Sequence, residues 1–188
     1  MRQPTILSDY VLIDAIEALG TSPWSGNIFR SCKHGRDVLQ GSASRGRWDD
    51  GSFDVLYTSL SLTGSIEEMR FHLGRGQPII PDKPIYKVHE ISAELSKVIS
   101  IEDTAMLDRL GVDLAKFGRA SYHHHQGEYS RTQELGSVAH FLDADGLLVP
   151  SARSNSKNLV IFCDQIVESS LRVIKDHGTV SQIANSTL

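Results

Sequence analysis

A short basic loop and a serine-containing turn hold the residues of this sequence whose types and order suit chemistry. The loop contains Gly46-Arg47-Trp48, where a guanidinium stands beside a large aromatic ring. The turn is Val149-Pro150-Ser151-Ala152-Arg153, which precedes an apolar run. The planar fork of an arginine suits bidentate contact with phosphate or carboxylate oxygens. Taken alone, the loop motif has an equally good structural interpretation. In that case the arginine forms an ion pair with Asp49 or Asp50, and the tryptophan fills the core.

Several familiar catalytic motifs are absent from the sequence. It has no Gly-x-x-x-x-Gly-Lys-Ser/Thr run of a P-loop and no Gly-x-Ser-x-Gly elbow of an α/β-hydrolase. The run His123-His124-His125 invites a metal interpretation, but adjacent histidines point in different directions and lack the spacing of zinc ligands. We therefore expect a polar loop there and no metal site. Cys32 has basic neighbours but no evident partner base, so it is a poor candidate for a nucleophile.

The order of motifs along the chain resembles that of the RES domain family, which is named after an Arg, a Glu and a Ser. The resemblance is carried by Ile28-Phe29-Arg30, Gly46-Arg47-Trp48, Leu56-Tyr57-Thr58-Ser59, Glu68 eleven residues after Tyr57, and Val149-Pro150-Ser151-Ala152. It runs from about residue 29 to residue 162 and so covers most of the chain. Members of this family include the toxins of bacterial toxin–antitoxin pairs.

The resemblance implies an activity on NAD and a fold similar to that of ADP-ribosyltransferases of the diphtheria-toxin type. Residue by residue, it matches the family's two arginines to Arg30 and Arg47, its strand aromatic to Tyr57, its acidic residue to Glu68 and its serine to Ser151. The sequence departs from the family pattern at two places. Asp49 stands where the family commonly has Asn, and Gly64-Ser65 stands where it often has Ala.

The matched residue types suit cleavage of the bond between nicotinamide and ribose, which builds oxocarbenium character on the ribose. A carboxylate at Glu68 would stabilise that charge, and the adjacent Glu67 is the alternative if the register is shifted by one. Glu68 is also spaced to complete a helix capping box with Ser65. Arg30 and Arg47 would bind the pyrophosphate of NAD.

Tyr57 and Ser151 would complete the substrate site. Tyr57 offers a ring that can stack on nicotinamide or adenine and a hydroxyl that can orient the ligand, although a half-buried strand tyrosine is the commoner fate. Ser151 would donate or accept a hydrogen bond to the ligand, or else satisfy the backbone of its own turn. No pairing of a serine with a histidine base is evident, so Ser151 is not expected to be a nucleophile.

The function that the resemblance implies is that of a toxin enzyme that degrades NAD by phosphorolysis or hydrolysis. NAD is then a substrate, phosphate a candidate co-substrate, and no cofactor is required. The alternatives are a protein ADP-ribosyltransferase and, in another class, a non-catalytic module that binds a nucleotide or a partner. A toxin of this family implies a cognate Xre-type antitoxin with a helix-turn-helix part, and a homo-oligomer stays open.

Composition limits the remaining classes. The chain has 188 residues, 19 Lys and Arg, and 23 Asp and Glu, so its formal net charge is −4. That balance disfavours direct nucleic-acid binding through global charge. Residues 26–48 nevertheless carry five basic residues against Asp37 alone, a local charge of +4 that suits a small anionic ligand. No stretch approaches the about 20 apolar residues of a membrane span, and we expect a cytoplasmic protein.

The pattern of elements predicts a single α+β domain over residues 1–188, with mixed short-strand sheets, flanking helices and a core from about residue 26 to 165. Apolar spacing predicts helices over 9–19, 65–73, 102–110 and 130–142. Strands are predicted over 53–59, 85–91, 98–101, 147–149, 159–162 and 171–174. Residues 21–30 read as turn-rich, residues 31–52 as a long loop, and residues 181–188 as a polar, frayed tail.

Overall fold

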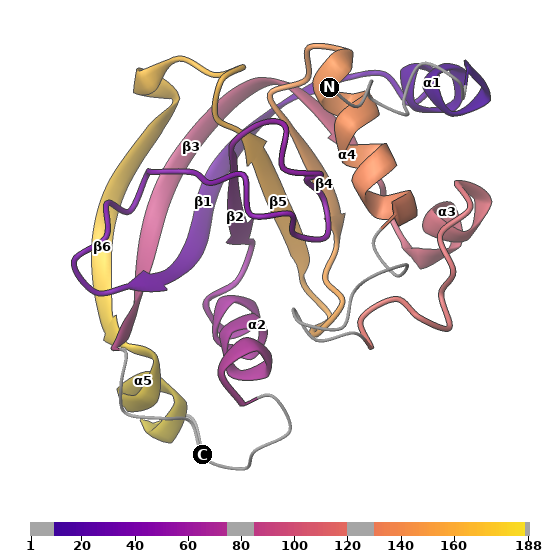
Figure 1. Ribbon diagram of the computed structural model, residues 1–188. Coiled ribbons are helices and arrows are strands. Elements are labelled where there is room, and N and C mark those ends of the chain that lie inside the picture. Colours follow the sequence, from indigo (N-terminus) through magenta and orange to yellow (C-terminus); the bar gives the residue numbers. More distant parts are fainter. Residues whose placement is uncertain (1–9, 75–84, 120–129, 187–188) are drawn as a thin grey trace.

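The computed structural model describes residues 10–74, 85–119 and 130–186 (Figure 1). Its α-helices are α1 Tyr10–Glu17, α2 Leu62–Gly74, α3 Thr104–Arg109, α4 Ser130–Phe141 and α5 Val180–Ser186. Its strands are β1 Ser22–Lys33, β2 Val55–Ser59, β3 Tyr86–Ser100, β4 Gly146–Pro150, β5 Lys157–Phe162 and β6 Leu171–Thr179, and a 3-10 turn, η2, covers Glu168–Ser170. Within the described ranges, no helix is both long and apolar enough to cross a membrane.

The described strands form one sheet in the order β1-β2-β5-β4-β3-β6. Because β1 also pairs with β3 along most of its length, the sheet curls back on itself. Figure 1 shows α1, α3 and α4 on the side of the molecule where β4 lies, and α2 below the end of β2. The predicted single α+β domain of a sheet with flanking helices is therefore confirmed.

The alternation of side chains gives the sheet two different faces. On the inner face of the curl, Ile28 of β1, Leu56 of β2 and Leu159 of β5 are buried in one apolar cluster. On the outer face, alternate residues of β2 and β5 pack with α1 and α4 in a second cluster. Because a strand sends successive side chains to opposite faces, each residue's place along its strand decides which cluster it joins.

Two strands are much longer than the sequence predicts. The turn-rich interpretation of residues 21–30 is wrong, because β1 pairs with β3 from Ser22 opposite Val98 to Lys33 opposite Tyr86. The two short strands predicted over 85–91 and 98–101 are a single strand, β3. Both regions are rich in polar residues with weak strand propensity, and pairing with a partner far along the chain supplies the backbone hydrogen bonds that local composition does not predict.

The helix that carries Glu68 begins earlier than predicted. The capping box of Ser65 and Glu68 is wrong, because Ser65 is buried within α2 and the hydroxyl of Ser61 accepts the hydrogen bond from Gly64 N at 3.0 Å. Ser61 thus acts as the N-cap. A Cβ on Gly64 would lie 2.5 Å from the hydroxyl oxygen of Ser59 and 2.8 Å from that of Ser61, so an alanine at this position would require these hydroxyl groups to move.

The C-terminal segment is ordered into a helix, where the sequence predicts a frayed tail from residue 181. Val180 is 2% exposed at the start of α5 and belongs to a cluster with Ile66 of α2 and Val88 of β3. Ile183, three residues on, packs against the same cluster. Two apolar residues on one face are enough to dock a short helix, although the rest of the segment is polar.

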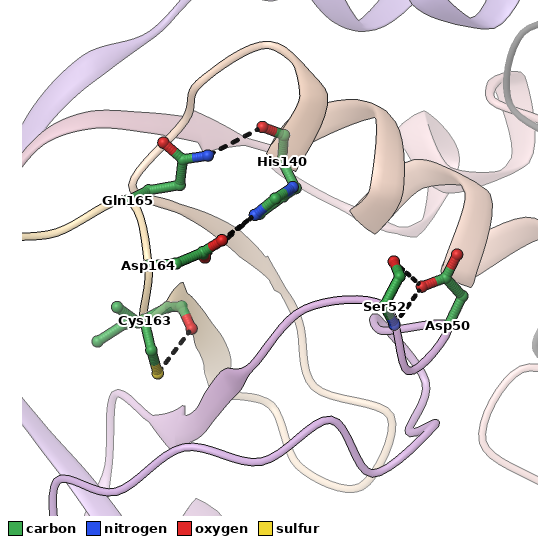
Figure 2. Close-up of polar contacts among 7 residues, drawn as sticks. Asp50, Ser52, His140, Cys163, Asp164 and Gln165 are labelled. Atoms are coloured by element: carbon green, nitrogen blue, oxygen red, sulfur yellow. Dashed lines mark hydrogen bonds and ion pairs between the residues drawn. The ribbon is translucent and has the colours of Figure 1, made fainter. Parts of the chain in front are cut away.

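Helix α4 holds the loop before β2 in place. Gly136 lies so close to the carbonyl oxygen of Trp48 that a Cβ there would overlap with it. At the end of α4, His140 stacks on Phe53 with ring centroids 4.2 Å apart. Figure 2 shows the His140 ring also bonded to Asp164, with Nε2 and a carboxylate oxygen 2.9 Å apart. The helix is therefore attached both to the loop and to the chain that follows β5.

Replacing Gly136 by alanine tests this close approach. Helix propensity alone would make Gly136→Ala stabilising by about 1 kcal/mol. We expect the opposite, a loss of about 1–3 kcal/mol in the free energy of unfolding, because the methyl group overlaps with backbone that cannot move away. The measurement is urea denaturation followed by circular dichroism. Glu134→Ala on the same helix, which removes a half-exposed ion pair with Arg131, should change stability by less than about 1 kcal/mol. A stabilised Gly136→Ala would contradict this packing.

Candidate functional site

A cavity of about 380 Å³ lies between α2 and the outer face of β1, β2 and β5. Its volume is within the range of about 300–1,000 Å³ that is typical of small-molecule sites. Its lining combines aromatic, hydroxyl, carboxylate and guanidinium groups: Phe29, Ser31, Ser44, Gly46, Arg47, Trp48, Tyr57, Thr58, Ser59, Ser65, Glu68, Met69, His72, Leu73, Tyr86, Arg153 and Asn158.

The register of three neighbouring strands builds the floor of the cavity. Phe29 of β1 lies opposite Ser59 of β2, and Ser59 lies opposite Asn158 of β5. Residues that lie opposite one another in an antiparallel pair point to the same face, and so do residues two apart on one strand. Tyr57 therefore joins this row, and all four side chains line the cavity.

One face of α2 covers this floor. The helix residues that line the cavity are Ser65, Glu68, Met69, His72 and Leu73, which repeat at spacings of three and four. That spacing places them along a single side of a helix. Ser65 fixes the helix to the sheet, because its hydroxyl lies 2.8 Å from the hydroxyl of Ser31 on β1. The carboxylate of Glu68 consequently points into the cavity from above.

Two side chains hold Glu68 by one oxygen. The hydroxyl of Ser151 donates to Oε1 at 2.9 Å, and the amide Nδ2 of Asn158 donates to the same oxygen at 3.0 Å. No described residue bonds the second oxygen, Oε2. The carboxylate is thus fixed in orientation while one of its oxygens is left to meet a ligand.

Ser151 acts through Glu68 rather than on the cavity itself. Besides donating to Glu68, its hydroxyl oxygen accepts hydrogen bonds from the backbone N–H groups of Arg153 at 3.1 Å and Ser154 at 3.2 Å. Ser151 does not line the cavity. The geometry therefore does not support the prediction that Ser151 contacts the substrate and instead makes it a positioning residue.

A buried carboxylate shapes the loop that carries Arg47. Asp49 is fully buried and accepts hydrogen bonds from Arg45 N at 2.7 Å and Gly46 N at 2.8 Å. The hydroxyl of Tyr57 donates to the same carboxylate at 2.8 Å. The side chain of Gln133 on α4 secures the loop further by donating to the carbonyl oxygen of Gly46 at 2.8 Å.

Tyr57 lines the cavity with its ring, but its hydroxyl is already occupied. It donates to Asp49 and accepts a hydrogen bond from Trp48 N at 2.9 Å. Burial raises the pKa of Tyr57 well above its ordinary value, and the nearby Asp49 carboxylate raises it further. The hydroxyl therefore stays protonated and holds the loop, so the predicted role of orienting the ligand through this group is not supported.

Two guanidinium groups on the cavity wall rest on aromatic rings. The Cζ atom of Arg47 lies 4.9 Å from the ring centroid of Phe117, and that of Arg153 lies 3.2 Å from the ring centroid of Phe71. Stacking of this kind fixes the plane of a guanidinium without neutralising its charge. The wall therefore carries two guanidinium groups held by aromatic rings, one from the predicted set and one from outside it.

Arg30 is a second predicted site residue, after Ser151, that does not line the cavity. It alternates with Phe29 and Ser31, which line the cavity, so its own side chain lies on the other face of β1. There it is 7% exposed and donates to the carbonyl oxygens of Val38 and of Gln40, the latter at 2.9 Å. Burial lowers the pKa of Arg30 to about 10, which leaves the group charged at neutral pH. Its observed contacts are structural, and the predicted contact with the pyrophosphate is not supported.

The family model of the RES domain matches residues 24–181 of this chain. The chain belongs to the RES domain family. The match covers the described sheet except the first two residues of β1, and it includes every residue that lines the cavity. The resemblance inferred from the motifs alone is thereby confirmed.

Relatives of this RES domain include proteins named NAD(+) phosphorylase MbcT from Mycobacterium bovis and Mycobacterium tuberculosis. Each is 28% identical over 153 residues, a stretch that covers 77% of either chain. The fold is similar to that of the crystal structure of the M. tuberculosis MbcT-MbcA toxin-antitoxin complex. The TM-score is 0.77 at 21% identity, and the alignment covers 94% of this chain and 97% of the other.

Sequence reasoning missed two residues of this RES domain that contact the centre of the site. They are Arg153, at the end of the serine-containing turn, and Asn158, directly before the apolar run that follows it. The position of Asn158 in the alternation of its strand could have identified it. Asn158 lies on the same strand face as Val160 and Phe162, near the start of β5, where this polar side chain lines the cavity. The alternative Glu67 does not line the cavity, and His123-His124-His125 lie outside the described residues.

The loop is the part of this RES domain most sensitive to a change of Asp49. In the wild-type protein, each carboxylate oxygen of Asp49 accepts a hydrogen bond from a backbone N–H group. In Asp49→Asn, one of these oxygens becomes an NH₂ group, which faces a backbone N–H in either orientation of the amide. We expect the free energy of unfolding to fall by about 1–3 kcal/mol, measured by urea denaturation. The matched control is Asp50→Asn. Among the described residues, Asp50 accepts hydrogen bonds from Ser52 alone and through one oxygen, which an asparagine retains (Figure 2), so little change is expected. Equal effects of the two changes would contradict the role assigned to Asp49.

Proposed function

We propose that this protein cleaves the bond between nicotinamide and ribose in NAD, with phosphate as the preferred acceptor, and that it acts as the toxin of a toxin–antitoxin pair. The observation that carries the proposal is the geometry of Glu68, which is held by one oxygen and leaves the other over a cavity walled by Arg47 and Arg153. The name NAD(+) phosphorylase MbcT of its relatives supports the same reaction.

Glu68 would stabilise the transition state. As the bond from C1′ of the ribose to the nicotinamide nitrogen breaks, positive charge develops on the ribose, and a nearby carboxylate is attracted more strongly to that charge than to the ground state. The tether from Ser151 and Asn158 keeps the carboxylate in place before the reaction, so little reorganisation is needed at the moment of cleavage.

Arg47 and Arg153 would bind the pyrophosphate. Both line the cavity, and both have their guanidinium planes fixed by stacking on phenylalanine rings. A preorganised guanidinium loses less conformational entropy when it forms two parallel hydrogen bonds to phosphate oxygens. Apolar and aromatic residues at the other side of the lining, Phe29, Met69 and Tyr86, suit a flat heterocyclic ring.

Phosphate can act as the acceptor without a general base, because it already carries an anionic oxygen that can attack C1′. One of its oxygens forms the new bond to C1′ while the electron pair of the old bond passes to the ring nitrogen and neutralises its positive charge. The products are free nicotinamide and ADP-ribose 1-phosphate, and no proton has to be transferred to the leaving group. Water as the acceptor gives ADP-ribose, and a protein side chain gives ADP-ribosylated protein.

Three finer features complete the proposal. The fold would be of the ADP-ribosyltransferase type, with the NAD site between the curled sheet and α2. The partner would be an Xre-type antitoxin with a helix-turn-helix part. The toxin-antitoxin complex of the similarly folded MbcT supports an antitoxin partner in general. The enzyme would act in the cytoplasm, where NAD is available, with no cofactor of its own.

Replacing Glu68 tests the reaction. Glu68→Gln retains an oxygen that can accept from Ser151 and Asn158 but removes the negative charge, so we expect kcat/KM for NAD to fall about 100- to 1,000-fold with the fold unchanged. Purified protein is incubated with NAD, with and without phosphate, and the products are separated by mass. Glu67→Gln is the matched control, since this neighbouring carboxylate does not line the cavity.

The product that the wild-type protein forms identifies the acceptor. ADP-ribose 1-phosphate supports phosphorolysis, ADP-ribose supports hydrolysis, and a protein that gains the mass of ADP-ribose supports protein modification. Expression of the wild-type chain should arrest bacterial growth, and Glu68→Gln should not. Wild-type protein that binds NAD but releases no nicotinamide with any acceptor would overturn the proposal in favour of a binding module.

The pyrophosphate contact has its own test. Arg47→Met and Arg153→Met keep an apolar stem against the phenylalanine rings but remove the charge. We expect the KM for NAD to rise about 10- to 100-fold in each, from the loss of charged hydrogen bonds. Cleavage of nicotinamide riboside, which lacks the pyrophosphate, should change little. Arg36→Met is the control, because Arg36 bonds the carbonyl oxygens of Gln40 and Gly41 and does not line the cavity.

A further inference from the structure

Asn158 carries a buried acceptor that no described residue satisfies. Its Oδ1 atom is shielded from solvent and has no hydrogen-bond partner among the described residues, while its Nδ2 atom donates to Glu68 at 3.0 Å. Buried polar atoms without a partner are uncommon because each one loses its hydrogen bonds to water. Asn158 also lines the cavity, so a ligand there is the natural source of the missing donor.

The orientation of this amide follows from its neighbour. A carboxylate oxygen only accepts hydrogen bonds, so the atom of Asn158 that meets Glu68 Oε1 must be the NH₂ group. The carbonyl oxygen of the amide is thereby directed away from that contact. Turning the amide over would set two acceptors against each other. The free acceptor is consequently a fixed property of the site.

Glu68 and Asn158 together present two acceptors side by side. Oε2 of Glu68 has no described partner, and Oδ1 of Asn158 has none either. The two groups are joined by the hydrogen bond between Nδ2 and Oε1, so their free oxygens belong to two side chains in direct contact. A ligand that meets both oxygens needs two O–H or N–H donors close together. Two neighbouring hydroxyls of a ribose have this arrangement.

We propose that Asn158 Oδ1 accepts a hydrogen bond from one of the two vicinal hydroxyls of the ribose under cleavage, beside the hydroxyl that meets Glu68. Asn158 is then a catalytic residue that contacts substrate, and the pair of acceptors selects a ribose over a deoxyribose. This inference rests on the proposed function, because it identifies the sugar that occupies the same site.

The test combines changes in the enzyme with changes in the substrate. Wild-type protein, Asn158→Ala and Ser151→Ala are each assayed with NAD and with NAD analogues that lack the 2′- or the 3′-hydroxyl of the nicotinamide ribose. Each analogue is compared with itself across the enzymes, so its altered intrinsic reactivity cancels. Ser151→Ala is the matched control, because it removes the other tether of Glu68 without changing the cavity lining.

We expect Asn158→Ala to lower kcat/KM for NAD about 10- to 100-fold, the value of a buried hydrogen bond. For one of the two analogues this loss should disappear, because the hydroxyl that Asn158 binds is already absent. Ser151→Ala should keep its full loss on that same analogue. If Asn158→Ala lowers the rate equally on NAD and on both analogues, Asn158 acts only by positioning Glu68 and the inference is overturned.

Failure of this inference can be distinguished from failure of the proposed function. If the wild-type protein binds NAD without cleaving it, the proposed function fails. The same comparison is then made with dissociation constants from calorimetry, where the loss in Asn158→Ala should again vanish for one analogue. Equal losses on all three ligands would overturn the inference alone. If the wild-type protein neither cleaves nor binds NAD, both are overturned.

Discussion

The buried carboxylate of Asp49 is the interaction on which the site depends most. It gathers two backbone N–H groups of the loop and the hydroxyl of Tyr57 from β2, so one side chain fixes the loop to the sheet. A buried charge is costly unless hydrogen bonds satisfy it, and these three donors do so. A Cβ on Gly46 would lie 2.6 Å from the Tyr57 hydroxyl, which shows how closely the loop is drawn in. Arg47 owes its place on the cavity wall to this arrangement.

A second set of contacts completes the site from the opposite direction. Glu68 comes from α2, whereas the two groups that hold it come from β5 and from the turn before β5, more than eighty residues later in the chain. The carboxylate is therefore in position only after the sheet has formed and α2 has docked on it through Ser65 and Ser31. Preorganisation of this kind is what electrostatic stabilisation of a transition state requires.

The sequence predicted the family, four of the five described α-helices and three residues that line the cavity, Arg47, Tyr57 and Glu68, because these depend on short motifs and local apolar spacing. It did not predict that β1 and β3 are long, since their pairing joins polar segments about sixty residues apart. The family resemblance placed Arg30 in the site, and the sequence did not reveal that this residue lies within a strand. Once β1 is a strand, the cavity-lining neighbours Phe29 and Ser31 put Arg30 on the other face, whatever its resemblance to a motif. Asn158 was missed for the converse reason, because its role depends on its register opposite Ser59.

The arginines of the basic segment, residues 26–48, have different roles on the two faces of the sheet. Arg30 and Arg36 bond backbone carbonyl oxygens of the loop between β1 and β2, so their charges organise the chain rather than a ligand. Arg47 is on the cavity side and is joined there by Arg153, which lies outside the segment. The local charge of +4 in residues 26–48 is therefore larger than the positive charge that faces the cavity. The composition of this segment alone would assign too many arginines to ligand binding. Under the proposed function, an anion would be recognised by Arg47 and Arg153, whose guanidinium groups stack on Phe117 and Phe71 and come from two distant parts of the chain.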